Sequence, residues 1–297
     1  MSTASRVGII GLGVMGSAYA RNLRKAGFEV TGYDPMPASM EALTSCGGIA
    51  ASDPQTVVTN SDVVLLALPS ARTLEQTISE IIPALHTRHI LAEMSTLPVD
   101  AKEDARSQVA TAGAILLDCP VSGTGAQAAN ADLAVYASGD KAAVDQIRPI
   151  FAGLARDVRY VGSFGAGMKL KYVANLLVSI HNLAAAEALL LAEKSGLDLQ
   201  MVYDAISSGS GAGNSRMFEV RGPLMVEGRY EPATMSMGLY QKDLALIMDH
   251  ARQVDCPVPL MSATLPFYSA AMAQGRARED TAALFAVLQQ LSTKGTT

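Results

Sequence analysis

The sequence predicts an α/β protein in which a doubly wound, largely parallel sheet is followed by an all-helical domain. Up to Tyr160, apolar runs of strand length alternate with helical segments, whereas beyond it helical segments follow one another. At 297 residues and 49% hydrophobic, the chain is too long for one ordinary core and can fill two. We therefore expect one domain at 1–162 and a second at 163–297.

The first strand of the predicted sheet runs into a glycine-rich turn. An apolar run, Val7–Ile10, precedes the GLGVMG segment at 11–16. This segment opens a helix closed by Gly27, and a second strand follows that ends at Tyr33 and Asp34. A GxGxxG turn between a strand and a helix, with an acid at the end of the next strand, is the dinucleotide fingerprint of the Rossmann fold. A glycine turn needed only for packing would not explain Asp34.

Each glycine of the turn has a separate task. Gly11 makes the tight turn, Gly13 lets the backbone approach a pyrophosphate, and Gly16 lets helix and strand pack closely. The helix N-terminus adds unpaired N–H groups and a favourable dipole. We expect the cofactor loop to comprise Gly11, Leu12, Gly13, Val14, Met15 and Gly16.

Asp34 bears on the choice of nicotinamide cofactor. A carboxylate at this position accepts hydrogen bonds from the ribose 2′-hydroxyl and repels a 2′-phosphate. The DPMPASM segment at 34–40 contains no arginine that would offset this repulsion. The sequence therefore favours NAD over NADP.

Five more strands are predicted, with helices between them, one of them from Lys141 to Leu154. In such sheets ligands bind beyond the carboxyl ends of the strands, where the chain carries Leu68, Pro69, Ser95 and Thr96. The strands are Val63–Leu68, His89–Glu93, Ile115–Asp118, Leu133–Ser138 and Val158–Tyr160.

The segment DCPVSGTGAQ at 118–127 ends one of these strands with small residues. Its backbone N–H groups and the Ser122 hydroxyl could form a concave site for a carboxylate. An ordinary glycine-rich connection is equally compatible with the pattern.

A long helix is predicted from Gly165 to Lys194. Lys171 and Asn175 share one of its faces, about one turn apart, among apolar neighbours. A buried ammonium and a buried amide need partners, so they pair with each other and a carboxylate, or they meet a ligand.

This helix is apolar enough to suggest a membrane span, but His181, Asn182 and Glu187 would be costly in lipid. We expect it to be buried in protein, partly in a subunit interface, and therefore predict a homodimer or homotetramer. Helical segments follow at Asp198–Ser207, Met217–Val226, Leu239–Gln253, Pro259–Gln274 and Asp280–Leu291. The loop at 207–216 could act as a substrate lid, and Lys242 with Asp243 suggests an ion pair in solvent.

Composition narrows the function classes. A net charge of −5 argues against nucleic acid or an anionic membrane as partner. Cys46, Cys119 and Cys256 are scattered, so neither disulfides nor a zinc site is expected, nor any other metal. No signal-peptide pattern opens the sequence. We expect a cytoplasmic protein with reduced thiols.

Four segments together resemble the β-hydroxyacid dehydrogenase family, which includes 3-hydroxyisobutyrate dehydrogenase, tartronate semialdehyde reductase and L-threonate dehydrogenase. The resemblance covers nearly the whole chain. The segments are GLGVMGSAYARNLRKAG, DCPVSGTGAQAANADL, GAGMKLKYVAN and QKDLALIMDHARQVDCPVP.

The resemblance implies that Lys171 is the catalytic residue, with Asn175 beside it, and that Ser122 and Gly123 hold the substrate carboxylate. It places Thr96 and Lys242 at the nicotinamide side of the cleft. Transfer of hydride from an alcohol requires a group that takes the hydroxyl proton, and an uncharged Lys171 can do this. The implied activity is oxidation of a small 3-hydroxy acid.

One position departs from the family pattern, because Thr124 stands where a second glycine is usual. Its side chain would narrow the pocket or offer a hydroxyl to a polar substrate. The stretch at 211–223 looks more like the threonate branch of the family.

Three alternative functions remain open. The chain could be an imine reductase, which Lys171 disfavours, or a 6-phosphogluconate dehydrogenase, whose helical domain is longer. It could also be a non-catalytic dinucleotide-binding module.

Overall fold

The computed structural model describes residues 6–209 and 212–292. The backbone forms two compact units that meet within one helix, between Lys171 and Tyr172. The first unit holds all the described strands, and each named element in the described part of the second unit is a helix. An α/β unit followed by a helical one confirms the predicted fold class.

A six-stranded sheet forms the centre of the first unit. Every neighbouring pair of strands is parallel, and the order is β3-β2-β1-β4-β5-β6. From β1 the chain adds strands first on one side, β2 and β3, and then on the other, from β4 to β6. Such sheets bind dinucleotides at the point between β1 and β4 where this order reverses. The strands are β1 (Arg6–Ile10), β2 (Glu29–Tyr33), β3 (Ile49–Ala50), β4 (Val63–Leu66), β5 (Ile90–Glu93) and β6 (Ile115–Asp118).

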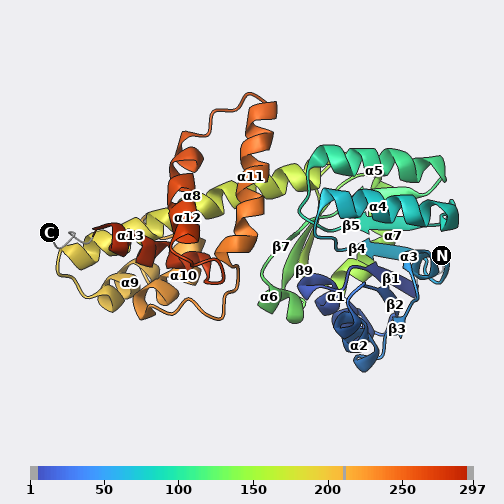
Figure 1. Cartoon of the computed structure of the whole chain (residues 1–297), viewed down its shortest axis with the longest axis horizontal. Helices are drawn as coiled ribbons and strands as arrows, with labels where there is room; N and C mark the ends of the chain where they lie inside the picture. Colours follow the sequence, from blue (N-terminus) through green and yellow to red (C-terminus); the bar gives the residue numbers. More distant parts are fainter. Residues whose placement is uncertain (1–5, 210–211, 293–297) are drawn as a thin grey trace. The chain divides into compact units, whose positions relative to one another are not determined.

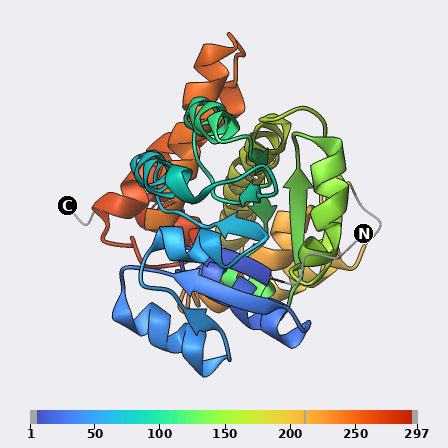
Figure 2. The same cartoon turned by 90° about the vertical axis from the view of Figure 1, so that its right-hand side faces the viewer.

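Apolar residues fill both faces of this sheet, because alternate side chains of a strand point to opposite faces. In β4, Val63 and Leu65 join one core, and Val64 and Leu66 join the other. Helices α4 and α5 lie side by side over the second face (Figure 1 and Figure 2). Helices α1 and α7 contribute buried residues to the core of the first face. The helices are α1 (Val14–Lys25), α2 (Pro37–Ser45), α3 (Pro54–Thr59), α4 (Ala71–Ile81), η1 (Ile82–Ala84), α5 (Val99–Thr111) and α7 (Lys141–Ala152).

The last strands of this unit form a separate small sheet. Strand β8 (Leu133–Ala137) pairs with β7 (Val121–Ser122) in antiparallel fashion and with β9 (Ala155–Tyr160) in parallel. Helix α6 (Gly125–Ala129) connects β7 to β8. The expectation of one continuous sheet was wrong here, because a strand pattern shows where strands lie but not with which strand each one pairs.

The second unit is built from the later part of α8 (Ala166–Lys194) and the helices that follow it. Four of these elements begin with a side-chain cap from Asp198, Ser215, Ser236 or Asp280, which satisfies backbone N–H groups of the first turn. The elements are α9 (Leu199–Ser207), α10 (Arg216–Glu227), α11 (Met237–Gln253), α12 (Pro259–Ala273), η2 (Thr281–Ala283) and α13 (Leu284–Ser292).

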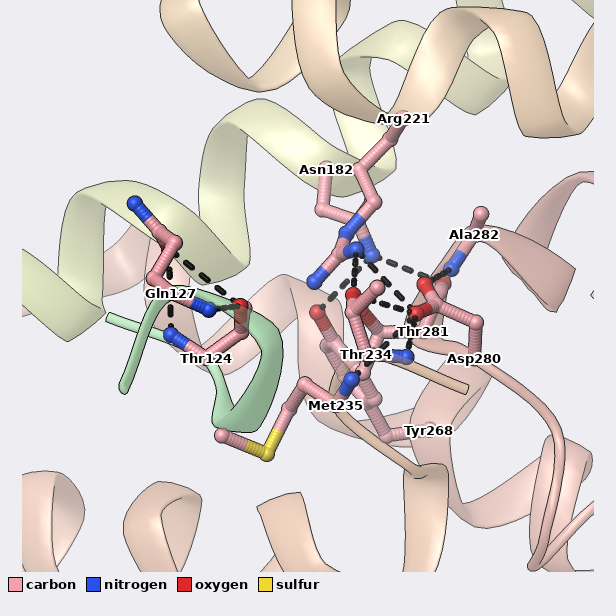
Figure 3. Close-up of polar contacts among 10 residues, drawn as sticks. All are labelled: Thr124, Gln127, Asn182, Arg221, Thr234, Met235, Tyr268, Asp280, Thr281 and Ala282. Atoms are coloured by element: carbon pink, nitrogen blue, oxygen red, sulfur yellow. Dashed lines mark hydrogen bonds and ion pairs between the residues drawn. The ribbon is translucent and has the colours of Figure 1, made fainter. Parts of the chain in front are cut away.

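A buried ion pair joins α10 to the start of η2. Arg221 lies 3.1 Å from Asp280, whose carboxylate also accepts hydrogen bonds from the backbone N–H and the hydroxyl of Thr234, each at 2.8 Å (Figure 3). Buried charges require such partners.

Part of the loop at 207–216 that was expected to act as a substrate lid, residues 210–211, lies outside the described residues.

Helix α8 is the one described helix long and apolar enough to cross a membrane by length and composition, although only 33% of its apolar window is buried. Its buried face carries polar groups: Ser179 shares a hydrogen bond with Tyr240, and Asn182 donates to the Thr281 carbonyl at 2.8 Å. Its exposed face carries an apolar stripe on the second unit: Val173, Leu177, Ala184, Ala188 and Leu191.

Candidate active site

The glycine loop between β1 and α1 has the geometry that a dinucleotide pyrophosphate requires. Gly11 has a positive φ of 92°, and a Cβ there would lie 2.3 Å from the Ala67 carbonyl oxygen. A Cβ at Gly16 would lie 1.9 Å from the Gly11 oxygen, so helix and turn touch. A Cβ at Gly13 would meet no atom of the described chain within 4 Å. Gly13 therefore borders open space at the α1 N-terminus, where N–H groups can bind phosphate.

Asp34 braces this loop. Its Oδ2 accepts a hydrogen bond from the Leu12 backbone N–H at 2.7 Å, and its Oδ1 accepts one from the Met36 N–H at 2.9 Å. The sequence predicted a carboxylate at the end of β2, and the structure places it directly against the loop. A carboxylate here can accept hydrogen bonds from ribose hydroxyls and would repel a phosphate at the ribose 2′ position. Together with the glycine loop, Asp34 therefore fits a dinucleotide.

The ends of β4 and β5 meet beside each other. The Leu68 backbone N–H donates to the Ser95 hydroxyl at 2.7 Å. Pro69 is exposed and Thr96 is half-buried. The two predicted cofactor segments, after β4 and after β5, are thus joined through a buried hydrogen bond.

The predicted carboxylate loop follows β6. Ser122 is half-buried at the end of β7, and Gly123 has a positive φ of 142°. A Cβ at Gly123 would lie 2.5 Å from the Leu133 side chain. Only glycine therefore suits this position.

Thr124 has a structural task that its sequence position did not reveal. It caps α6: its hydroxyl accepts a hydrogen bond from the Gln127 N–H at 3.3 Å, and the Gln127 Oε1 accepts one from the Thr124 N–H at 3.0 Å (Figure 3). This reciprocal capping box fixes the start of α6. Of the two roles considered for Thr124, narrowing the pocket or offering a hydroxyl, the second involves a hydroxyl that is already engaged with its own helix.

Lys171 is brought to the carboxylate loop. Its Nζ donates a hydrogen bond to the Val121 carbonyl oxygen at 2.5 Å, next to Ser122. Fifty residues separate this donor and acceptor along the chain. The half-buried ammonium thus lies at the loop predicted to bind a carboxylate.

Asn175, one turn further along α8, belongs to the second unit. Its Nδ2 donates to the Asp243 Oδ2 at 2.9 Å, and Asp243 is only 7% exposed, whereas Lys242 is exposed. The interpretation of these neighbours as an ion pair in solvent is not supported for Asp243. Adjacent residues on a helix do not face each other, so Lys242 and Asp243 point differently. Nothing in the sequence indicated Asp243 as the partner of Asn175.

Comparisons with known proteins agree with this geometry. The family model described as the NAD-binding domain of 6-phosphogluconate dehydrogenase matches residues 6–162. The model described as NAD-binding of NADP-dependent 3-hydroxyisobutyrate dehydrogenase matches residues 165–288.

Individual relatives match over nearly their full length. An L-threonate dehydrogenase from Cupriavidus necator is 32% identical, covering 97% of this chain and 98% of the relative. The structure of a Mycobacterium tuberculosis 3-hydroxyisobutyrate dehydrogenase is 28% identical, with a TM-score of 0.88, and covers 96% of this chain and 99% of that one. An imine reductase from a Pseudomonas species, at 20% identity and a TM-score of 0.61, covers 96% of this chain and 99% of that one and shares the fold. With both units matched in order, this chain belongs to the β-hydroxyacid dehydrogenase family.

Proposed function

We propose that this protein oxidises a small 3-hydroxy carboxylic acid, reversibly, with Lys171 as the general acid and base. The observation that carries the proposal is the hydrogen bond from Lys171 to the Val121 carbonyl, because it holds an ammonium beside Ser122. The bound nicotinamide dinucleotide supplies or accepts the hydride. The chain provides the groups that bind the acid and move its proton.

The substrate carboxylate would accept hydrogen bonds from the Ser122 hydroxyl and the Gly123 backbone N–H. In the oxidative direction the Lys171 Nζ, once uncharged, takes the hydroxyl proton, and in the reductive direction its ammonium returns the proton. Asn175 would orient a substrate oxygen, with Asp243 holding its amide. Thr96 and Lys242 would contact the nicotinamide end of the cofactor.

The proposed substrate class is polyhydroxylated C3 and C4 acids. Thr124 in place of a second glycine adds bulk beside the carboxylate loop, and its hydroxyl is occupied in capping α6. It would therefore shape the pocket by volume. Similarity to L-threonate dehydrogenase over 97% of this chain supports this class.

The test is reduction of NAD, followed by absorbance, with 3-hydroxyisobutyrate, glycerate, L-threonate and erythronate. We expect turnover with at least one of them, highest for a polyhydroxylated acid. Binding of NAD without turnover on any of the four would contradict the substrate class. It would favour a non-catalytic dinucleotide-binding module.

We propose NAD as the preferred cofactor, because the Asp34 carboxylate lies at the end of β2 against the glycine loop. Its charge would repel a 2′-phosphate, and we expect kcat/KM to be at least about tenfold higher with NAD. Asp34→Ser should raise the efficiency with NADP relative to NAD. Equal efficiencies in the wild-type enzyme would refute the preference.

We also propose a homodimer or homotetramer in the cytoplasm, with no nucleic acid or membrane as partner. The exposed apolar stripe of α8 supports self-association, since contiguous apolar surface marks interaction sites. All three cysteines are free thiols, as expected for a reducing compartment.

A further inference from the structure

Under the ends of β5 and β6, a lysine is enclosed between two carboxylates. The Lys102 Nζ lies 2.6 Å from the Glu93 Oε2 and 2.7 Å from the Asp118 Oδ1, and all three side chains are fully buried. Glu93 is the last residue of β5, Asp118 the last of β6, and Lys102 lies in the first turn of α5. In the sequence, Lys102 cannot be distinguished from a lysine on the exposed face of a helix.

Lys102 stays charged in this position. Burial alone would lower the pKa of Lys102, but the carboxylates of Glu93 and Asp118 raise it above its usual value. A buried cluster of ions is a weak source of net stability, since desolvation offsets the attraction between its charges. The role of the cluster is therefore inferred from the residues that its carboxylates contact and not from its contribution to stability.

The Glu93 carboxylate reaches the segments predicted to bind the dinucleotide. Its Oε1 accepts a hydrogen bond from the Ser95 N–H at 2.9 Å, and the Ser95 hydroxyl accepts one from the Leu68 N–H at 2.7 Å. Glu93 thus fixes the turn that carries Thr96 and, through Ser95, the end of β4.

The Asp118 carboxylate reaches the helix that carries Lys171. Its Oδ2 accepts hydrogen bonds from the Met168 N–H at 2.9 Å and from the Ser138 hydroxyl at 3.0 Å. The Ser138 hydroxyl in turn accepts one from the Gly167 N–H at 3.0 Å. These are first-turn N–H groups of α8, which have no partner within their own helix. Asp118 and Ser138 therefore cap α8 from outside, one turn before Lys171.

We infer that Glu93, Lys102 and Asp118 are positioning residues: Glu93 holds the dinucleotide segments, Asp118 holds the start of the Lys171 helix, and Lys102 pairs with both carboxylates. Lys102 joins the two carboxylates, so each branch of the cluster fixes one part of the candidate site. This inference rests on the proposed function for its kinetic consequence. Its structural consequence is independent of turnover: the backbone of the dinucleotide segments and of the first turn of α8 is held rigid.

Two isosteric substitutions separate the branches. In Asp118→Asn, the α8 cap loses its charge, so we expect kcat to fall by about 10²-fold, since a small misplacement of a reacting group has that effect. The Kd for NAD should stay within about twofold. In Glu93→Gln, we expect the Kd for NAD to rise by about tenfold.

Hydrogen exchange provides a readout that does not need activity. Amides of Gly167 and Met168 should exchange faster in Asp118→Asn than in wild type, and those of Leu68 and Ser95 faster in Glu93→Gln. The milder variants Ser138→Ala and Ser95→Ala report on the same two branches if the charge changes prevent folding. Asp104→Asn, which removes an exposed carboxylate of α5, is the matched control and should change neither measurement.

A purely structural role would overturn the inference. In that case the variants would lower the melting temperature, while kcat, the Kd for NAD and exchange at both segments stayed at wild-type values in the folded protein. Equal effects of both substitutions on both segments would also overturn it. If no hydroxy acid is turned over but the exchange and NAD-binding results separate as described, the proposed substrate class fails and the positioning role stands.

Discussion

At the scale of single residues, side chains far apart in the sequence hold one another in place: Asn175 donates to Asp243, and Lys102 pairs with Glu93 and Asp118. Lys171 and Asn175 stand out because polar residues on an apolar helix face need partners. Asp243 does not stand out, since its contact with Asn175 spans 68 residues of chain. Lys102 was missed for the same reason, because only the tertiary fold brings its two carboxylates together.

The contact between Asn175 and Asp243 leads to a prediction. Asp243→Ala removes the acceptor that holds the Asn175 amide at 2.9 Å, so the amide can rotate away from a substrate oxygen. We expect kcat to fall by about ten- to a hundredfold. Steady-state kinetics with the best hydroxy acid provides the measurement.

Two further variants of α11 make this result specific. Asp243→Asn keeps an acceptor oxygen and should recover much of the lost rate. Asp249→Ala removes an exposed carboxylate of the same helix and should leave the kinetics unchanged. Full activity in Asp243→Ala would show that Asn175 does not depend on this contact.

At the scale of secondary-structure elements, the sequence was most informative where the controlling interactions are local. The roles of Gly11 and Gly16 follow from short-range sterics, and the contacts a Cβ would make confirm them. Three helices of the second unit are capped by Asp198, Ser215 and Ser236. The predicted start coincides with the cap at Asp198, whereas the segments predicted from Met217 and Leu239 begin after theirs. Strand β7 could not be found, because two residues carry no alternation pattern.

The prediction at this scale concerns the apolar stripe of helix α8 and its role in assembly. Leu191 is 70% exposed on its apolar stripe, so Leu191→Glu should place a charge in the proposed subunit interface and weaken assembly by at least about tenfold. Sedimentation at micromolar concentration measures the mass. Leu260→Glu, at a comparably exposed leucine of α12, controls for the added charge. A wild-type mass of one chain, 31.0 kDa, would contradict the predicted homo-oligomer.

At the scale of the whole molecule, the alternation of strands and helices was sufficient to predict the α/β unit and the helical unit after it. Pairing between distant strands was beyond the pattern, so the separate β7-β8-β9 sheet was not foreseen. The buried charges were not foreseen either. Composition indicates how many ionisable groups a chain has, whereas the fold determines which of them are buried.

Those buried groups predict how stability depends on pH. Burial raises the pKa of Tyr268 to about 12 and also raises that of Tyr19. The pKa of each tyrosine is higher in the folded state than in the unfolded state, so its contribution to stability is complete below pH ~10. As the pH rises from there towards the folded-state pKa, each group lowers the free energy of unfolding by about 1.4 kcal/mol per pH unit. The raised pKa of Lys102 acts in the same direction.

Urea unfolding measured from about pH 9 to about pH 11 should therefore show a falling midpoint. Tyr19→Phe removes one titrating group and should make the decline less steep. A midpoint independent of pH over this interval would mean that these side chains are accessible to solvent in the folded protein.

The central claim, that Lys171 transfers the proton, is tested most directly by comparing Lys171→Ala with Lys169→Ala. Lys169 is an exposed lysine of the same helix turn and serves as the matched control. We predict that Lys171→Ala lowers kcat by about 10²- to 10⁴-fold while the Kd for NAD, measured by titration calorimetry, stays unchanged, and that Lys169→Ala retains wild-type kcat. Wild-type turnover in Lys171→Ala would contradict the account.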